Sequence, residues 1–421
     1  GPCNPHVTEI LRKAPSHLPQ PRRAMRYCLA AAAAAIGAAV LAPLLSSMPA
    51  PFDDVVALDI PLDRQALYPG RANGSAIPAE LSGPFASNEK LHMAKRLFER
   101  EIIGSESVAM TPSGDLIMID RLGYVHRAVP EKMYGSGYDL KKPPLYIGPG
   151  RPLGFHVLND DTALVCDSLK GLLRVSLRSG AIEVLSNAVH GPDGTATPFQ
   201  YANDLDVASD GTVYFTSCTN HTVALNPAGG FYDTMRSATL SAVRGTASGQ
   251  LLRYDPKTRR TTSLVGGISY ANGVALSSDE SWVAVVETYH ARVLRHWLKG
   301  PRKAKTEVLL DRLPGFPDGI SRGRDGGFWL CLVYPLAPLV GLLAPYRLLR
   351  QLLSHVVVPL LPLIAKKWGA VVRLDADGRA VETLYDPTGW NVATISAATE
   401  APDGRLFLGN LAGDYVSFVR I

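Results

Sequence analysis

Polar side chains with oxygen donors recur at one fixed offset from successive turns of this sequence. The turns read PSGDLIMI, NDDTALV, SDGTVYFT, SDESWVAVVE, GRDGGFWL and PDGRLFLG. Eight residues before each tight-turn position stand Glu106, Leu153, Asn203, Asn272, Asp318 and Ser396. The pattern predicts that Glu106, Asn203, Asn272 and Asp318 bind a metal ion. Two carboxylates and two amide carbonyls suit Ca²⁺, which accepts neutral oxygens and water. Taken singly, Asn-Asp, Asn-Gly and Asp-Gly are ordinary turn dipeptides, which is the alternative interpretation.

A second set of candidates follows about fourteen residues after the first set. There the second strand of each hairpin returns toward the start of the first strand. We therefore expect Asp120, Asp167 and Ser217 to form a substrate-lining rim, with His221 and His290 just beyond it; Ser396, from the first set, also lines the substrate site. Glu287 or Asp167 is a candidate general base if an apolar wall raises its pKa. The alternative is that these carboxylates bind the amides of their own turns.

The repeated hairpins must position both sets. Short apolar runs separated by Gly/Asp turns recur at spacings typical of propeller blades. Six units predict an all-β, six-bladed β-propeller over 95–421, in which the first strand of each blade lines the axis. The chain ends in three strand-like runs, TISAATEA, RLFLGNL and YVSFVRI. Segment 95–103, KRLFEREII, is expected to add the fourth strand and close the ring.

Composition excludes several classes of protein. Of the 421 residues, 46% are hydrophobic and 19% charged, which rules out a mainly disordered chain. The 38 Gly and 32 Pro favour many turns. The net charge of +5 comes mostly from residues 1–28, so we expect no nucleic-acid partner. The sequence has no Cys/His cluster of the kind that binds zinc. At most one disulfide can form among Cys166, Cys218 and Cys331.

Residues 28–48, CLAAAAAAIGAAVLAPLLSSM, form an uncharged span of about bilayer length. The basic segment before it predicts a single-pass type II signal anchor, with 1–27 as a cytosolic tail and 49–94 as a linker. The propeller would then face the lumen of the endoplasmic reticulum or the outside of the plasma membrane. There the sequons at Asn73 and Asn220 are candidate glycosylation sites. A cleaved signal peptide and a buried Ala-rich helix are the alternatives.

An apolar, basic insertion interrupts blade five. Residues 333–373 contain Leu at helical spacing and five Lys or Arg without an acidic residue, and several prolines prevent a continuous span. The segment 333–368 is expected to form a helical lid over the propeller mouth. A second interpretation places this surface on the same membrane as the anchor. The two are compatible, since a lid at a membrane would admit lipophilic substrates.

Several segments resemble the strictosidine synthase-like family. They include NDLDVASDGTVYFT, GQLLRYDPKTRRTTSLV, ANGVALSSDESWVAVVET, ARVLRHWLKGP, KRLFEREIIGSESV and LPGFPDGI, and the resemblance covers roughly 95–421. The family is similar in fold to paraoxonases, gluconolactonases and regucalcin, which are six-bladed propellers with an axial Ca²⁺. The ligands that this resemblance implies fall on Glu106, Asn203, Asn272 and Asp318. Where paraoxonases place an Asn after the Asp, this sequence has Gly319.

Departures from the family's catalytic residues narrow the implied function. The last-blade Glu of strictosidine synthase falls on Ser396 or Ala397, which argues against Pictet–Spengler condensation. The His pair of paraoxonases would fall at Leu153 and near Asp167, so it is absent. The remaining hypothesis is calcium-dependent hydrolysis of small lipophilic aryl esters or lactones, with Asp318 and Glu287 as catalytic candidates. The alternative is a membrane-anchored binding or adhesion module in which Ca²⁺ is structural.

Overall fold

The structure is a computed structural model that describes two units of the chain, 1–57 and 58–421. It describes residues 30, 32, 34–40, 81–131, 137–226, 229–245, 247–336, 346, 349, 352, 353, 355 and 365–421. In the first unit the described positions between 30 and 40 are helical. No helix among the described residues is long and apolar enough to cross a membrane. Most of the predicted anchor, 28–48, lies outside the described residues, as do the tail and most of the linker.

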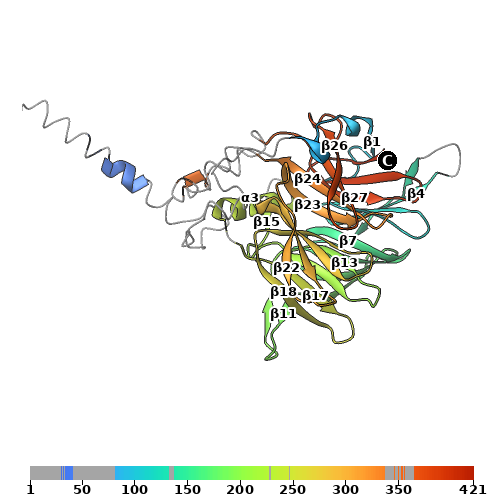
Figure 1. Cartoon of the computed structure of the whole chain (residues 1–421), viewed down its shortest axis with the longest axis horizontal. Helices are drawn as coiled ribbons and strands as arrows, with labels where there is room; N and C mark the ends of the chain where they lie inside the picture. Colours follow the sequence, from blue (N-terminus) through green and yellow to red (C-terminus); the bar gives the residue numbers. More distant parts are fainter. Residues whose placement is uncertain are drawn as a thin grey trace, which may run out of the picture. The chain divides into compact units, whose positions relative to one another are not determined.

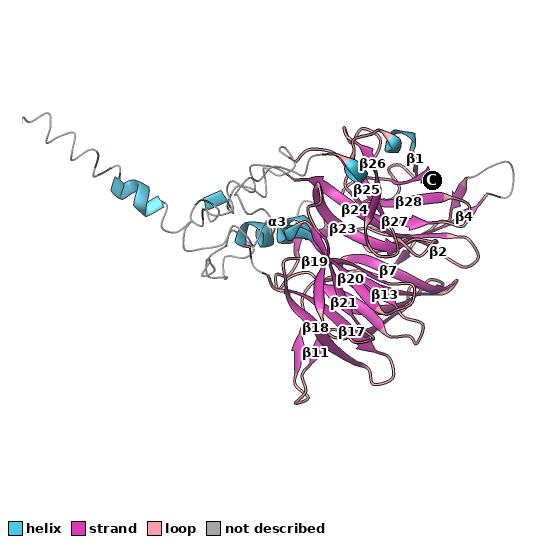
Figure 2. Cartoon of the chain, in the orientation of Figure 1, coloured by secondary structure: helices cyan, strands magenta, loops and turns pink. Residues whose placement is uncertain are grey.

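The second unit is built from five four-stranded antiparallel sheets and one five-stranded sheet, accompanied by two two-stranded hairpins. Figure 2 shows that strands make up most of this unit. Blade one contains β2 (Val108–Met110), β3 (Leu116–Ile119), β4 (Tyr124–Pro130) and β5 (Tyr138–Leu140), with β6 (Leu145–Tyr146) also paired to β4. Blade two contains β7 (Pro152–Asn159), β8 (Thr162–Asp167), β9 (Gly171–Ser176) and β10 (Ile182–Ser186). Blade three contains β13 (Ala202–Val207), β14 (Val213–Ser217), β17 (Gly249–Asp255) and β18 (Arg260–Ile268).

The other three blades repeat this arrangement. Blade four contains β19 (Ala271–Leu276), β20 (Trp282–Glu287), β21 (Arg292–Trp297) and β22 (Thr306–Leu310). Blade five contains β23 (Gly315–Arg322), β24 (Phe328–Pro335), β25 (Gly369–Leu374) and β26 (Ala380–Asp386). Blade six contains β27 (Ile395–Glu400), β28 (Arg405–Asn410), β29 (Val416–Arg420) and β1 (Lys95–Leu97). The predicted all-β, six-bladed propeller is therefore confirmed.

The first strand of each blade faces the axis. These strands contact one another in the order β2, β7, β13, β19, β23, β27 and back to β2. Such a closed ring of inner strands defines the centre of a propeller. The prediction that the first strand of each repeat lines the axis is thus confirmed.

The ring is closed by the start of the domain. β1 pairs antiparallel with β29, with Lys95 opposite Phe418 and Leu97 opposite Val416. Figure 1 shows the C-terminus beside β1. The closing strand was expected within 95–103 and occupies its first three residues. The 3₁₀ turn η4 (Lys90–Met93) contacts β26, so the residues before β1 also bind the last two blades together.

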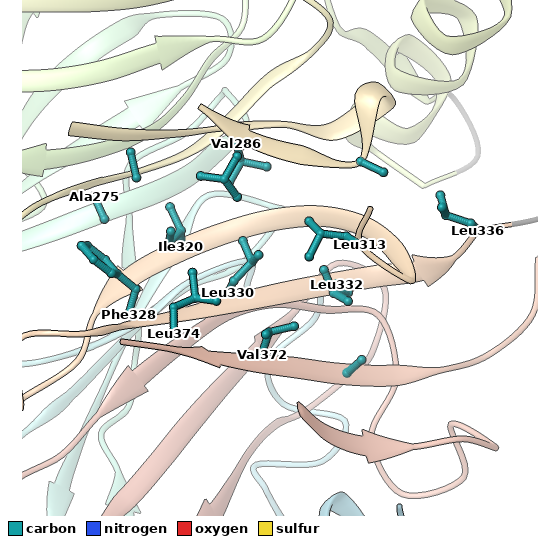
Figure 3. Close-up of a cluster of buried hydrophobic side chains, with 14 of the residues drawn as sticks. Ala275, Val286, Leu313, Ile320, Phe328, Leu330, Leu332, Leu336, Val372 and Leu374 are labelled. Atoms are coloured by element: carbon teal, nitrogen blue, oxygen red, sulfur yellow. The ribbon is translucent and has the colours of Figure 1, made fainter. Parts of the chain in front are cut away.

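The hydrophobic core lies between neighbouring blades. In β24, Phe328, Leu330 and Leu332 face a cluster shared with blade four, drawn in Figure 3. The intervening Trp329 and Cys331 face a second cluster shared with blade six. Successive side chains of a strand point to opposite faces, and both faces of this strand are covered. This explains its continuous apolar run, which differs from the alternating pattern of a half-exposed strand.

Three insertions depart from the simple repeat. A hairpin of β11 (Ala188–His190) and β12 (Ala196–Pro198) separates blades two and three. Between β14 and β17 lie the hairpin of β15 (Ala224–Asn226) and β16 (Phe231–Asp233) and the helix α3 (Thr234–Arg244), which the sequence analysis did not predict. In blade five β24 and β25 pair directly, and most of the predicted lid between them lies outside the described residues.

The residues before β1 should contribute measurably to the stability of the whole propeller. Leu91 is fully buried in the cluster between blades five and six, whereas Met93 is 78% exposed. Leu91→Ala should lower the free energy of unfolding by about 2–5 kcal/mol because it leaves a cavity. Met93→Ala, the matched control, should change it by less than about 0.5 kcal/mol. Urea denaturation measures both, and equal midpoints for the two variants would contradict a closing role for this segment.

Candidate functional site

Six residues at equivalent positions surround the axis, one at the start of each inner strand. In five blades the strand is irregular at this place, with register shifts between Pro152 and Phe155, Ala202 and Leu205, Ala271 and Val274, Pro317 and Ile320, and Ile395 and Ala397. A β-bulge bends a strand and re-aims its side chains. The bulges therefore fall at Leu153, Asn203, Asn272, Asp318 and Ser396.

The inner strands are packed so closely here that glycine is required beside the axial residues. A Cβ on Gly319 would collide with the carbonyl oxygen of Ser396. A Cβ on Gly273 would lie 2.6 Å from the carbonyl oxygen of Asp318. The dipeptides Asn272-Gly273 and Asp318-Gly319 thus combine a polar side chain at the axis with a neighbour that lets the next blade approach.

The four predicted metal ligands lie as two neighbouring pairs. The Asn203 side chain lowers the pKa of the nearby Glu106, and the Asn272 side chain lowers that of the nearby Asp318. Asn272 Nδ2 also lies 3.2 Å from Thr288 Oγ1, which donates to Pro317 O at 2.9 Å. All four side chains are buried, with at most 7% of each residue exposed. The structure therefore places together the four residues that were predicted as ligands.

Burial makes the two axial carboxyl groups weak acids in the metal-free protein. Desolvation raises the pKa of Glu106 to about 7, although Arg151 and the Asn203 hydrogen bond lower it. Desolvation and the nearby Glu106 carboxylate raise the pKa of Asp318 well above its usual range. Desolvation also raises the pKa of Asp204 to about 7, in spite of hydrogen bonds from the Val274 and Leu205 amides.

The donor set fits a divalent cation that prefers oxygen. Asp318 Oδ2 is buried and has no hydrogen-bond partner. Two neighbouring buried carboxylates are stabilised when a cation lies between them. The described residues contain no cluster of three or more His, Cys, Asp or Glu side chains that could hold a metal. A site here would therefore depend on its amide oxygens, as the sequence analysis proposed.

The two other axial positions supply no charged oxygen. Leu153 is apolar and buried, and Ser396 Oγ donates to the carbonyl oxygen of Glu106 at 2.7 Å. Blade two instead brings a cation close to the axis, because Arg151 Nη2 lies 3.9 Å from Glu106 Oε2. Sequence reasoning missed Arg151, which precedes an apolar member of the ring by two residues.

The expected rim residues stand where the second strands end, level with the axial residues. Asp167 lies opposite Pro152, Ser217 opposite Ala202, and Glu287 opposite Ala271 in their ladders. Their polar atoms, however, mostly bind local turns. Asp167 Oδ1 accepts from the amides of Leu169 and Lys170, and Ser217 Oγ donates to Gln200 O.

Asp120 shows the same behaviour in blade one. Its Oδ1 accepts from the amides of Leu122 and Tyr124, and its Oδ2 lies 2.9 Å from His126 Nε2. These carboxylates thus match the alternative that the sequence analysis named, in which they cap their own turns.

Glu287 is held by several donors. Its Oε1 accepts from the Ser269 amide at 2.8 Å and lies 2.9 Å from His290 Nδ1, while its Oε2 pairs with Arg292. These contacts lower the pKa of Glu287 even though burial raises it. A carboxylate with a lowered pKa and three partners is a poor general base near neutral pH. This environment favours a structural role for Glu287 and for its neighbour His290.

His221 lies under the insertion of blade three. It is buried, its carbonyl accepts from Ser237 of α3, and burial with the nearby Arg244 lowers its pKa to about 4. Cys166, Cys218 and Cys331 are buried free thiols. Asn220 is exposed, as an acceptor of a glycan must be, and Asn73 lies outside the described residues.

A cavity of about 530 Å³ lies at the end of the central channel where the inner strands finish. It extends from there to the axial residues. All six inner strands contribute to its wall, and Glu106, Asn203 and Ser396 form part of it. His156 and Asp206 line its sides, with His156 Nδ1 3.6 Å from Asp206 Oδ1. Sequence reasoning left the orientation of His156 open, and the structure turns it into this cavity.

The fold and this axial ring define a six-bladed propeller with oxygen donors converging on its axis. Residues 203–301 match the family model described as strictosidine synthase, and residues 83–127 match the model described as strictosidine synthase-like, N-terminal. Adipocyte plasma membrane-associated protein from Salmo salar is 30% identical over 80% of each chain. Strictosidine synthase-like 13 from Arabidopsis thaliana is 31% identical over 57% of each chain. The chain therefore belongs to the strictosidine synthase-like family.

A solved structure shows the same fold in a more distant protein. A gluconolactonase from Xanthomonas campestris superposes with a TM-score of 0.53, at 18% identity over 82% of this chain and 96% of that one. At this identity the similarity shows the fold alone.

The pKa of Glu106 gives a pH-dependent prediction for the metal-free protein. Between the usual pKa of 4.5 and the folded value of about 7, the folded state binds more protons than the unfolded chain. Stability should therefore fall as the pH rises through this window. Glu106→Gln should remove up to about 3 kcal/mol of this pH dependence between about pH 4 and pH 8, because Gln does not titrate.

Urea denaturation in the presence of a chelator tests this effect. Glu101→Gln, at a more exposed carboxylate, is the control and should leave the pH profile unchanged. If Glu106→Gln destabilises the metal-free protein equally at both pH values, Glu106 is not a buried acid of raised pKa.

Proposed function

We propose that this protein is a calcium-dependent hydrolase of small lipophilic aryl esters or lactones. The observation that supports the proposal is the convergence of Glu106, Asn203, Asn272 and Asp318 on the axis, with the buried Asp318 Oδ2 lacking a partner. Polarisation of the ester carbonyl and stabilisation of the oxyanion are the chemistry that a bound Ca²⁺ supplies. The four side chains would hold the ion through two carboxylate groups and two amide oxygens.

The protein's own groups would supply the remaining steps. The cavity next to Glu106 and Asn203 is large enough for a small ester, and it has an apolar wall that includes Phe155 and Ile320. Asp318 is the candidate acceptor for the proton of the attacking water, because its free carboxylate oxygen lies at the axis. Glu287 is not assigned as the base, since its oxygens are already bonded.

We further propose that the propeller is attached to a membrane by residues 28–48, in the type II orientation expected from sequence. The relatives named adipocyte plasma membrane-associated protein support this location. The apolar, basic segment 333–373 is the candidate for a second contact with the same membrane, and it would bring lipophilic substrates close to the domain.

Removal of the metal should abolish hydrolysis. Purified protein treated with a chelator should lose at least about a hundredfold in the rate of phenyl acetate or lactone hydrolysis, and added Ca²⁺ should restore it. Asp318→Asn should lower kcat to a similar extent while Glu287→Gln leaves it nearly unchanged. An equal rate with and without chelator would overturn metal catalysis.

Filling the cavity should separate substrate access from metal binding. Ala397 lines the cavity and is partly exposed within it. Ala397→Phe should lower kcat/KM for aryl esters at least about tenfold and leave Ca²⁺ affinity unchanged, whereas Ala397→Ser, the matched control, should behave like the original protein. Unchanged kcat/KM in the Phe variant would mean that substrate does not use this cavity.

A non-catalytic binding or adhesion module with structural calcium is the second candidate. The hydrogen bonds that hold Asp120 and Glu287 in their local turns favour it, because they leave neither carboxylate free to act as a general base. This function predicts no turnover of any ester at high protein concentration, together with stabilisation by Ca²⁺. The thermal melting temperature with and without Ca²⁺, measured beside the ester panel, distinguishes the two candidates.

A further inference from the structure

Arg151 is a buried cation with few partners beside the axial carboxylates. It is 2% exposed and directly precedes β7. Its Nη1 donates to Gly104 O at 3.4 Å, and its Nε has no hydrogen-bond partner. A guanidinium group has five N–H donors, so most of its hydrogen-bonding capacity is unused. Such a group remains buried only if nearby negative charge compensates it.

The compensating charge comes from the metal ligands themselves. Glu106 Oε2 lies 3.9 Å from Arg151 Nη2, and this is the ion pair that the structure gives for Arg151 within its described residues. Arg121, whose side chain lies beside Gly104, is a second cation in this region and gives no compensating negative charge. The Arg151 guanidinium and a cation bound by Glu106 would therefore share one carboxylate at close range.

We propose that Arg151 is the internal counter-ion of the axial site and weakens its affinity for a divalent cation. The inference rests on the proposed metal site. Without the cation, Arg151 stabilises the buried Glu106 carboxylate. With the cation bound, the two positive charges repel each other across a poorly screened interior. Blade two thus contributes a positive charge to the axial site through Arg151, whereas its axial residue Leu153 contributes no metal ligand. Occupancy of the site then depends on the free concentration of the cation.

Arg151→Met tests this role because it keeps much of the volume and removes the charge. Two measurements should move in opposite directions. The Ca²⁺ affinity, measured by calorimetry, should increase at least about tenfold, and the melting temperature in chelator near pH 8 should fall. A residue with a purely structural role would lower both. Arg151→Lys, which keeps the charge, should retain an affinity close to that of the original protein.

Arg322→Met is the matched control. Arg322 also lines the axial cavity and carries the same charge, but it pairs with Asp206 at 2.7 Å and not with a proposed ligand. Arg322→Met should change Ca²⁺ affinity less than about threefold. This variant measures the effect of losing one positive charge near the cavity without disturbing a proposed ligand. An unchanged or weaker Ca²⁺ affinity in Arg151→Met would overturn the inference.

The outcomes also separate this inference from the proposed function. If the original protein binds no Ca²⁺ in calorimetry, the axial metal site itself fails and the proposal for Arg151 falls with it. If the original protein binds Ca²⁺ but hydrolyses no ester, the hydrolase proposal fails while the counter-ion role stands on its affinity data. If Arg151→Met does not fold, the comparison of Arg151→Lys with Arg322→Met at several salt concentrations replaces it, and a tenfold affinity loss in Arg151→Lys would contradict the role.

Discussion

The close approach of six inner strands around one axis is the constraint on which the rest of the structure depends. Space at the centre is so limited that Gly273 and Gly319 cannot carry a side chain. The side chains that do point inward have no room to avoid one another and little water to screen their charges. Glu106 and Asp318 therefore raise each other's free energy when both are ionised. A divalent cation, protonation and Arg151 are three ways of relieving the same repulsion.

Much of the fold and the axial ring could be predicted from the sequence, because both follow from a repeat. The offset from turn to axial residue is the same in each blade, since each inner strand runs the same distance from the axis to its turn. That constancy identified Glu106, Asn203, Asn272 and Asp318 before any coordinates. Closure by the segment at Lys95 followed from counting the strands of the last blade.

The remainder depends on contacts that no repeat encodes. Strand pairing places Asp167 and Glu287 beside the axial residues, as expected from the repeat. The hydrogen-bond partners of their carboxylates, however, depend on local turns that differ from blade to blade. Arg151 escaped notice because its importance comes from proximity to Glu106, far away in sequence. The helix α3 belongs to an insertion without counterpart in other blades, so no comparison between repeats could place it.

The pairing of β1 with β29 has a consequence for the order of events during biosynthesis. Lys95 leaves the ribosome long before its partner Phe418. The outer position of blade six must therefore stay open until β29 has been made, with the exposed edge of a sheet available to wrong partners. A contact that spans nearly the whole domain also forms slowly, because a long loop must close first. The ring of blades is thus completed only when β29 pairs with the much earlier strand β1.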